Sequence, residues 1–284
     1  CIRDRNKLMN LHPLVPLVLK YRQVTKLNST YIEGIRPYVR DGVIHTKYNQ
    51  TLTSTGRLSS SEPNLQNIPV RTPMGREIRR AFIAPAGSVL VDADYSQIEL
   101  RLLAHLSGDE AMCEAFTLGQ DIHARTAAEV YGVPLAEVTP QMRSSAKAVN
   151  FGIVYGISDF GLAANLHISR KEAAEFIARY FARYPAIHRF MEACVSQGKA
   201  EGYSVTMYGR RRPLPELSSP NYNRRQFGER AAMNTPVQGA AADIIKIAMN
   251  AVHDELKAAG LAAKLILQVH DELICLLYTS PSPR

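Results

Sequence analysis

The spacing of apolar residues predicts a helical middle with short strands on either side of it. Residues 88–94 (SVLVDAD) form a short apolar run that favours a strand, and residues 97–106 (QIELRLLAHL) change to helical spacing. Residues 110–199 have an almost wholly helical pattern, interrupted by glycines and by Pro185. Asp94 therefore lies where a strand gives way to a helix.

The last third of the chain predicts a hairpin, a long helix and a pair of strands. Residues 203–212 suggest a hairpin with a basic turn, and residues 231–259 suggest a long helix. Two apolar runs within residues 264–277 flank His270, Asp271 and Glu272, which favours two strands with a turn at the acidic residues.

The first part of the chain is less informative. Residues 3–48 have a mixed amphipathic pattern without a chemical motif. Residues 51–71 are rich in Ser, Thr, Asn, Gly and Pro, so we predict a loop there rather than a helix or a strand.

The composition is that of a folded protein with a basic surface. Of the 284 residues, 46% are hydrophobic and 21% are charged, which argues against a disordered or collagen-like chain and suits two domains or one large divided one. The net charge of +8 favours a polyanionic partner such as nucleic acid. The four cysteines lie far apart with no CxxC pair, so we expect packing cysteines in a reducing compartment and a cytoplasmic location. No apolar run approaches the roughly 18 residues of a membrane span, and we expect neither a membrane segment nor a signal peptide.

A candidate nucleotide-binding stripe lies on a predicted helix that begins at Thr139-Pro140, where Thr can cap and Pro is tolerated. Its members, spaced by four, are Arg143, Lys147, Phe151 and Tyr155. Cations can bind phosphate oxygens near a helix N-terminus, and aromatic rings can stack on sugar and base. By spacing alone, a solvated basic turn followed by core-facing aromatic residues explains the same pattern, so the stripe needs independent support.

Acidic residues supply that support. Asp94 and Asp271 each follow an apolar run, so neighbouring strands of one sheet could present both carboxylates to a shared pair of Mg²⁺ ions. Taken singly, an acid at a strand end is usually a turn former or a cap. Asp92 has the same strand parity as Asp94 and is a rival, whereas Asp254, in a second VHDEL string, falls in a continuous helical pattern and is assigned to an exposed helix face. His270 and Glu272 could orient a metal or only satisfy the turn.

Three long motifs carry a resemblance to a known family. DYSQIELR at 94–101, RSSAKAVNFGIVYG at 143–156 and QVHDEL at 268–273 closely resemble the polymerase motifs of family A, or DNA polymerase I-like, DNA polymerases. The match extends to TSTGRLSS at 53–60, PNLQNIPVR at 63–71 and NTPVQGAAADIIK at 234–246, and so spans nearly all of residues 21–275.

The resemblance implies an α+β fold, a right-hand polymerase with an antiparallel palm sheet, mostly helical fingers and a thumb that is largely absent. It divides the chain into the base of a thumb (1–28), the first part of the palm (29–108), the fingers (109–222), the second part of the palm (223–275) and an unassigned tail (276–284). The ending LLYTSPSPR resembles nothing in the family, which suggests that this tail and residues 1–5 are not native sequence.

The resemblance also implies a function, template-directed addition of deoxynucleotides from dNTPs to a primer 3′ end, by a monomer that binds primer-template DNA. Two Mg²⁺ ions, with Mn²⁺ as an alternative, would be held by Asp94, Asp271 and the carbonyl of Tyr95. Lys147 would be a candidate proton donor to the leaving group, and Glu272 is kept as a candidate catalytic residue.

Further roles follow from the same resemblance. Glu99 resembles the steric gate that excludes a ribose 2′-hydroxyl, Phe151 implies that dideoxynucleotides are disfavoured, and Tyr155 would stack near the templating position. The nucleotide-binding set is Tyr95, Gln97, Glu99, His123, Arg143, Lys147, Phe151 and Tyr155. The residues that match contacts to the primer-template are Arg57, Asn64, Gln66, Arg230, Asn234, Gln238 and His270.

Two other functions stay open on the sequence. A catalytically impaired DNA-binding fragment of such a polymerase would keep the basic groove without turnover. A two-metal nuclease would share the carboxylates but would give no role to the stripe of residues 143–155.

Overall fold

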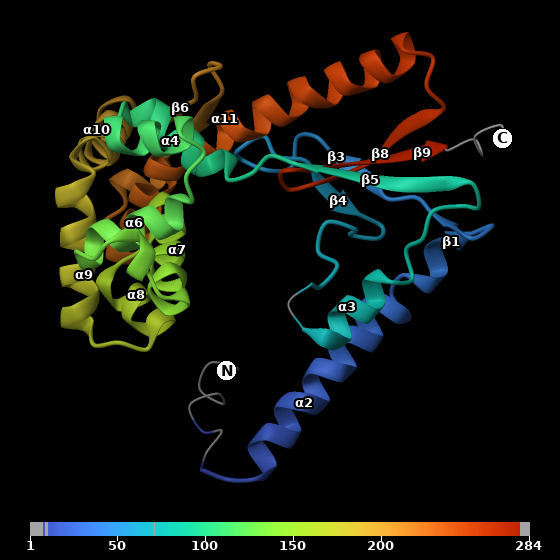
Figure 1. Cartoon of the computed structure of the whole chain (residues 1–284), viewed down its shortest axis with the longest axis horizontal. Helices are drawn as coiled ribbons and strands as arrows, with labels where there is room; N and C mark the ends of the chain where they lie inside the picture. Colours follow the sequence, from blue (N-terminus) through green and yellow to red (C-terminus); the bar gives the residue numbers. More distant parts are fainter. Residues whose placement is uncertain (1–7, 9–10, 71, 279–284) are drawn as a thin grey trace. The chain divides into compact units, whose positions relative to one another are not determined.

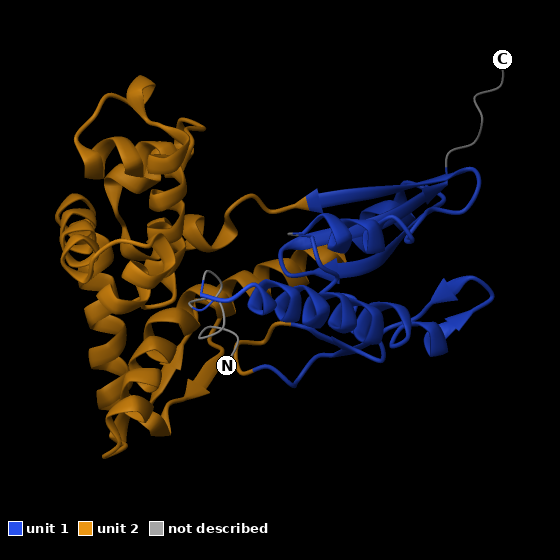
Figure 2. Cartoon of the chain, turned by 90° about the horizontal axis from the view of Figure 1, so that it is seen from below, with its two compact units in different colours: residues 1–53, 58–93, 252–284 blue, residues 54–57, 94–251 orange. Residues whose placement is uncertain are grey.

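The structure is a computed structural model that describes residue 8 and residues 11–70 and 72–278. The chain divides into two compact units (Figure 2). Unit 1 contains residues 1–53, 58–93 and 252–284, and unit 2 contains residues 54–57 and 94–251. The sequence suggests a non-native origin for residues 1–5 and for the tail 276–284. Of these, the structure describes only residues 276–278. The predicted boundaries of thumb, palm and fingers stay predictions.

A three-stranded sheet lies in unit 1, except for Asp94, the last residue of its first strand, which is counted with unit 2. Its strands are β5 (Ser88–Asp94), β8 (Ala263–Val269) and β9 (Glu272–Tyr278), in the order β5-β9-β8 (Figure 1). β8 and β9 are antiparallel, with Ala263 opposite Leu277 and Val269 opposite Glu272. The predicted strand pair with its turn at His270 and Asp271 is therefore confirmed.

The direction of β5 relative to β9 follows from a contact at one end of the sheet. A Cβ atom at Gly87, directly before β5, would lie only 3.2 Å from Cε2 of Tyr278, the last residue of β9. The start of β5 thus lies beside the end of β9. Because both strands have seven residues, the end of β5 at Asp94 lies toward the start of β9 at Glu272.

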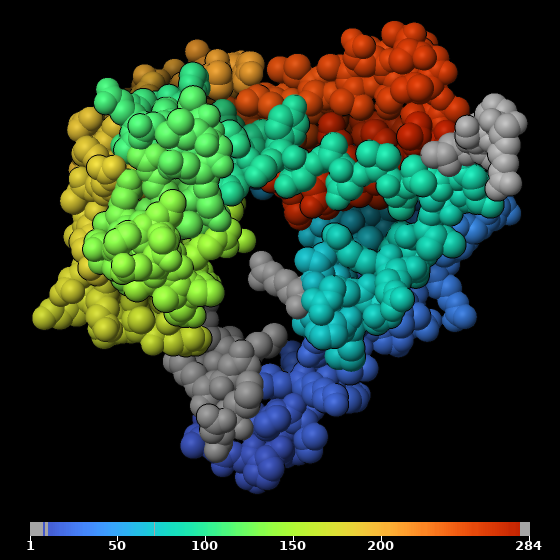
Figure 3. Space-filling model, in the orientation of Figure 1, coloured from blue at the N-terminus to red at the C-terminus, as the bar shows by residue number. Residues whose placement is uncertain are grey.

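Small elements complete unit 1. They are α2 (Leu14–Leu27), a π-helical turn (Asn28–Ile32), a 3₁₀ turn (Arg36–Tyr38), β1 (Val39–Arg40), β2 (Val43–Ile44), β3 (Lys47–Asn49), β4 (Ser59–Ser61) and α3 (Pro73–Arg79). α2 has no buried residue, and its side chains lie at the surface in Figure 3. Within the loop predicted at 51–71, residues 59–61 instead form β4 and pair with β3, a contact between segments that periodicity cannot reveal. Residue 71 lies outside the described residues.

Unit 2 is almost entirely helical, as predicted. Its helices before residue 202 are α4 (Ile98–Ser107), α5 (Glu110–Thr117), α6 (Ile122–Tyr131), α7 (Pro140–Val154), α8 (Asp159–Leu166), α9 (Arg170–Arg183) and α10 (Pro185–Glu201), with a 3₁₀ turn at Leu135–Glu137. The predicted hairpin follows as β6 (Tyr203–Val205) and β7 (Arg211–Pro213), and then a 3₁₀ turn at Pro215–Ser218. In the described part of the chain, no helix combines the length and the hydropathy that crossing a membrane requires.

Capping residues explain where most of these helices begin. Thr139 accepts a hydrogen bond from the Met142 amide at 3.2 Å, and Pro140 opens α7, as the sequence predicts. Ser169 and Glu172 form a capping box at the start of α9. Buried aromatic residues such as Tyr180 and Tyr184 then fill the core between the helices.

The long helix α11 (Tyr222–Ala258) begins nine residues before the predicted start at residue 231. The segment 222–230 is polar and lacks a helical apolar period, so its pattern gave no signal. Tertiary packing holds it instead. A Cβ atom at Gly228 would lie 2.9 Å from the Leu217 backbone amide, so the helix packs closely on the preceding 3₁₀ turn.

Candidate functional site

The predicted stripe lies on α7 in the expected order. Arg143 and Lys147 are exposed, Phe151 is half-buried, and Tyr155 forms the C-cap of the helix. The Arg143 Nε donates to Oδ2 of Asp121 at 2.7 Å, and both side chains are about two-fifths exposed (44% and 42%). The cations are therefore accessible to an anion from solvent.

Asp121 has two structural tasks. Its Oδ1 accepts hydrogen bonds from the amides of His123 and Ala124, both at 3.0 Å, and so caps α6, while its Oδ2 holds Arg143. Burial acts to raise the pKa of Asp121, but the hydrogen bonds from Arg143 and the two amides outweigh it and lower the pKa. Asp121 is therefore ionised at neutral pH. The sequence analysis missed this residue.

His123 is buried, with only 2% of its surface exposed. Its Nδ1 lies 3.1 Å from Nδ2 of Asn150, and its ring centroid lies 5.7 Å from that of Phe151. Burial is the main cause that lowers the pKa of His123 to about 4; Arg143 and Lys147 add to the effect, and Asp121 opposes it. His123 is therefore uncharged at neutral pH.

The predicted gate residue is held by two partners. Glu99, buried on α4, forms an ion pair with Arg57 and accepts a hydrogen bond from the Tyr155 hydroxyl at 2.9 Å. Burial and the charge of Glu99 raise the pKa of Tyr155 to about 12, although Gln238 also hydrogen-bonds its hydroxyl. Three predicted residues from distant parts of the sequence are thus brought together within unit 2.

Arg230, Asn234 and Gln238 lie at spacings of four on α11, and therefore on one face of it. A Cβ atom at Gly156, which has φ +64°, would lie 2.7 Å from Cε of Met233 and 2.8 Å from Cγ of Arg230. This face of α11 therefore packs against the turn that follows α7.

Two buried oxygen atoms of predicted site residues, Oε1 of Gln97 and Oδ1 of Asn234, have no hydrogen-bond partner among the described residues. Gln97 is the N-cap residue of α4, with φ +57°. Tyr95 is 41% exposed, and its carbonyl accepts a long backbone hydrogen bond of 3.3 Å from Ile98.

An arginine outside the predicted set also joins separate segments of unit 2. Arg210, in the basic turn of the β6-β7 hairpin, forms an ion pair with Asp243 on α11. A Cβ atom at Gly56 would lie 2.5 Å from its guanidinium carbon, so Arg210 also packs against the loop that carries Arg57. The basic turn was visible in the sequence, but its partner was not.

In unit 1, the predicted DNA contacts Asn64, Gln66 and His270 form one polar cluster around Gln268. Nε2 of Gln66 donates to Oε1 of Gln268 at 3.1 Å and to the backbone carbonyl of Gln268 at 3.2 Å. The backbone amide of Gln66 donates to Oδ1 of Asn64 at 3.0 Å. Gln268 donates to the His270 carbonyl. Tyr48 fixes Gln268 from β3, because its hydroxyl bonds both backbone groups of that residue.

The acidic candidates differ in their place in the fold. Asp94 is the last residue of β5, and Asp271 lies in the turn that leads into β9, so both belong to the same end of neighbouring strands. Asp254 lies exposed inside α11, which confirms its assignment to a helix face. Asp92 lies on β5 two residues before Asp94 and stays a rival. Among the described residues, no group of three or more His, Cys, Asp and Glu side chains could hold a metal.

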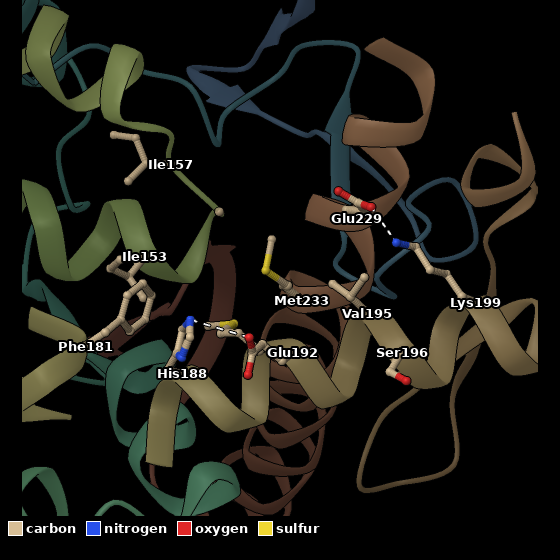
Figure 4. A pocket seen from close by; sticks show the side chains of 12 residues that line it. Ile153, Ile157, Phe181, His188, Glu192, Val195, Ser196, Lys199, Glu229 and Met233 are labelled. Carbon is tan, nitrogen blue, oxygen red and sulfur yellow. Dashed lines mark hydrogen bonds and ion pairs between the residues drawn. The ribbon is translucent and has the colours of Figure 1, made fainter. Parts of the chain in front are cut away.

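A hollow of about 560 Å³ in unit 2 is lined by residues at the end of α7 and was not predicted from the sequence (Figure 4). Ile153, Phe181 and Met233 contribute apolar surface. Lys199 and Glu229 form an ion pair of 2.7 Å at its border. The turn after α7, α10 and α11 therefore all border this hollow.

Comparisons with known proteins agree with this arrangement. A family model described as DNA polymerase family A matches residues 4–281. The chain is 57% identical over 272 residues to DNA polymerase I of Bacillus caldotenax and 53% identical over 270 residues to DNA polymerase I of Caldicellulosiruptor bescii. These matches cover 94% of this chain but only 31% and 32% of those proteins, so the chain spans about a third of the length of its curated relatives.

A solved structure, the POL domain of Pol1 from M. smegmatis in complex with DNA primer-template and dNTP, matches with a TM-score of 0.90 and 47% identity. The match covers 96% of this chain and 48% of that one. The predicted α+β fold of a polymerase domain is confirmed.

Proposed function

Since this chain belongs to DNA polymerase family A, we propose that it catalyses template-directed addition of deoxynucleotides from dNTPs to the 3′ end of a DNA primer. Its similarity to a domain solved with DNA primer-template and dNTP supports this assignment of substrates. The basic net charge of +8 suits a polyanionic partner.

The exposed cations of α7 would bind the triphosphate. Arg143 offers a planar guanidinium that can bond two phosphate oxygens, and Lys147 lies one helical turn further along. His123 lies close enough for both cations to lower its pKa, and in its neutral form it can donate one hydrogen bond. Lys147 would also be positioned to give a proton to the departing pyrophosphate.

The donor set at the end of the β5-β9 pair fits divalent magnesium. Asp94 and Asp271 supply two carboxylates and Tyr95 a carbonyl with a free lone pair, all hard oxygen ligands of the kind that Mg²⁺ prefers. Two bound ions would lower the pKa of the primer 3′-hydroxyl and neutralise charge on the phosphates. Oxygen atoms of the nucleotide would complete the coordination of the ions. This agrees with the finding that no three acidic, His or Cys side chains gather at one place among the described residues.

Glu99 would select the sugar. Its carboxylate is fixed from two sides, by Arg57 and by the Tyr155 hydroxyl, so it cannot readily move aside for a larger ligand. A ribose 2′-hydroxyl in that space would meet a buried, already bonded acid. We propose that this arrangement excludes ribonucleotides.

Two separate sets of polar groups are candidate contacts to the primer-template. Asn64, Gln66 and His270 supply a cluster in unit 1, and Arg230, Asn234 and Gln238 supply a face of α11. Amide and guanidinium groups of this kind suit contacts that position DNA without reading its sequence.

The observation that supports the proposal most directly is the order β5-β9-β8, together with the approach of Gly87 to Tyr278, from which we infer that the ends of β5 and β9 near Asp94 and Asp271 lie together. Primer extension with Mg²⁺ tests it. We expect Asp94→Asn and Asp271→Asn to abolish extension, because an amide is a weak ligand for Mg²⁺. Asp254→Asn is the matched control, since that residue lies in an identical VHDEL string on an exposed face of α11.

The outcomes distinguish this function from its rivals. Extension that depends on Asp254 or Asp92 but not on Asp271 would contradict the site. DNA binding without extension in the unmodified chain would favour a catalytically impaired DNA-binding fragment, and DNA hydrolysis without dNTP would favour a nuclease.

A further inference from the structure

A buried chain of hydrogen bonds lies behind His123. Asn150, on α7, is fully buried, and its Nδ2 lies 3.1 Å from Nδ1 of His123 and 3.1 Å from Oγ1 of Thr126. Thr126 Oγ1 lies 3.3 Å from the hydroxyl of Tyr184, which lies 2.6 Å from Oε2 of Glu129. Thr126 and Tyr184 are also fully buried.

The chain has a fixed direction because it ends on an ionised carboxylate. Glu129 Oε1 accepts hydrogen bonds from Arg183 at 2.8 Å and from Arg125 at 3.2 Å. Burial acts to raise the pKa of Glu129, but the bonds from Arg183, Tyr184 and Arg125 outweigh it and lower the pKa. A carboxylate has no proton to give, so Tyr184 donates its only hydroxyl proton to Glu129.

The Thr126 hydroxyl has two acceptors within reach. Because the Tyr184 proton is committed to Glu129, the Thr126 proton goes either to the Tyr184 oxygen or to Oδ1 of Asn150, both 3.3 Å away. With either acceptor, Thr126 has no second proton, and its oxygen accepts from Nδ2 of Asn150 at 3.1 Å. The second amide proton of Asn150 points to Nδ1 of His123, which is therefore an acceptor.

We propose that Asn150 is a positioning residue that holds His123 in the neutral tautomer with its proton on Nε2. Through this chain Glu129 and Asn150 fix which ring nitrogen can donate a hydrogen bond to the triphosphate. The inference rests on the proposed function, because the triphosphate is the ligand that the donor would meet.

A neutral donor suits this place. Arg143 and Lys147 already supply positive charge beside the ring, and burial disfavours a third cation. Nε2 of His123 has no hydrogen-bond partner within the part of the chain that the structure describes, so no group of the described protein takes up its proton. The inverted tautomer would present a lone pair to the phosphate oxygens and repel them.

Nitrogen-15 NMR of the full chain, labelled at histidine, tests the tautomer without any catalysis. The His123 signals are assigned by their loss in His123→Gln. We expect the pattern of a neutral imidazole protonated at Nε2 from pH 6 to pH 8. Protonation at Nδ1 in that range would overturn the proposal.

Asn150→Asp tests the role of the amide with almost no change of shape. An aspartate cannot donate to Nδ1, so we expect His123 to carry its proton there and its pKa to rise. At pH 8 the Kd for dNTP should increase about tenfold, the loss of one hydrogen bond. Binding should recover as the pH falls below the raised pKa, because the charged ring donates from both nitrogens, whereas the wild type should show no such dependence.

Thr126→Ser is the matched control, because it keeps the hydroxyl, and it should leave the tautomer and the Kd as in the wild type. An unchanged tautomer and Kd in Asn150→Asp would overturn the proposal. If that variant does not fold, the wild-type spectrum still decides. If His123 shows the Nε2 tautomer but the chain never extends a primer, the proposed function is rejected and the assignment of the tautomer stands.

Discussion

The ion pair between Arg143 and Asp121 predicts that Asp121 competes with the triphosphate for the guanidinium. Asp121→Asn removes the charge but keeps the cap of α6, since Asn and Asp are equally good N-cap residues. An ion pair in which both side chains are about two-fifths exposed is worth about 0.2–1 kcal/mol. That range corresponds to about a 1.4- to fivefold change in affinity.

We therefore expect the Kd for dNTP to fall by about 1.4- to fivefold in Asp121→Asn, with little change in the maximal rate. The difference should shrink as salt is added, because salt screens exposed charges. Single-turnover primer extension at varied dNTP concentration measures both quantities.

Asp159→Asn is the matched control. Asp159 forms a similar pair of 2.6 Å with the exposed Arg170, on helices that carry none of the predicted nucleotide contacts. This variant should leave the Kd unchanged. Weaker dNTP binding in Asp121→Asn would refute the reasoning, because it would mean that Asp121 orients Arg143 for the phosphates instead of competing with them.

Three further predictions concern single residues. Glu99→Ala should relax exclusion of ribonucleotides, measured by paired dNTP and rNTP incorporation; unchanged selectivity would reject the gate. Gly156→Ala should destabilise the fold by about 1 kcal/mol more than Gly132→Ala in urea denaturation. Both positions have positive φ, but only a Cβ atom at Gly156 would lie within 3 Å of other side chains, 2.8 Å from Cγ of Arg230 and 2.7 Å from Cε of Met233. Equal losses would count against this packing. Finally, His123 accepts a proton near pH 6.5 when unfolded but only near pH 4 when folded, so the unfolded state binds more protons between these values. The free energy of unfolding should fall by about 3 kcal/mol more in the wild type than in His123→Gln as the pH drops from 6.5 to 4, and parallel curves would contradict the low pKa.

Local chemistry made much of the fold predictable. Thr139 and Pro140 mark the start of α7 because capping depends on neighbouring residues alone. The β5 strand and the β8-β9 pair follow from short apolar runs and the turn between them. The start of α11 was missed because its first residues are polar and are held by packing on another segment.

The candidate site was predictable in its residue types but not in its contacts. Glu99 pairs with Arg57, 42 positions away in sequence, and Asp121 pairs with Arg143, 22 positions away. No local pattern encodes such pairs, since they depend on how helices and loops pack. Asn150 lies within the motif RSSAKAVNFGIVYG at 143–156, yet its role emerges only from the chain of donors that ends at Glu129.

The central claim is that Asp94 and Asp271 share divalent ions beside the bound nucleotide. A crystal structure of the chain with primer-template, a non-hydrolysable dNTP and Mn²⁺, read from the anomalous signal of the metal, tests it most directly. We predict two Mn²⁺ positions, with carboxylate oxygens of both aspartates as ligands. A metal bound without Asp271, or one held by Asp92 in place of Asp94, would contradict the account.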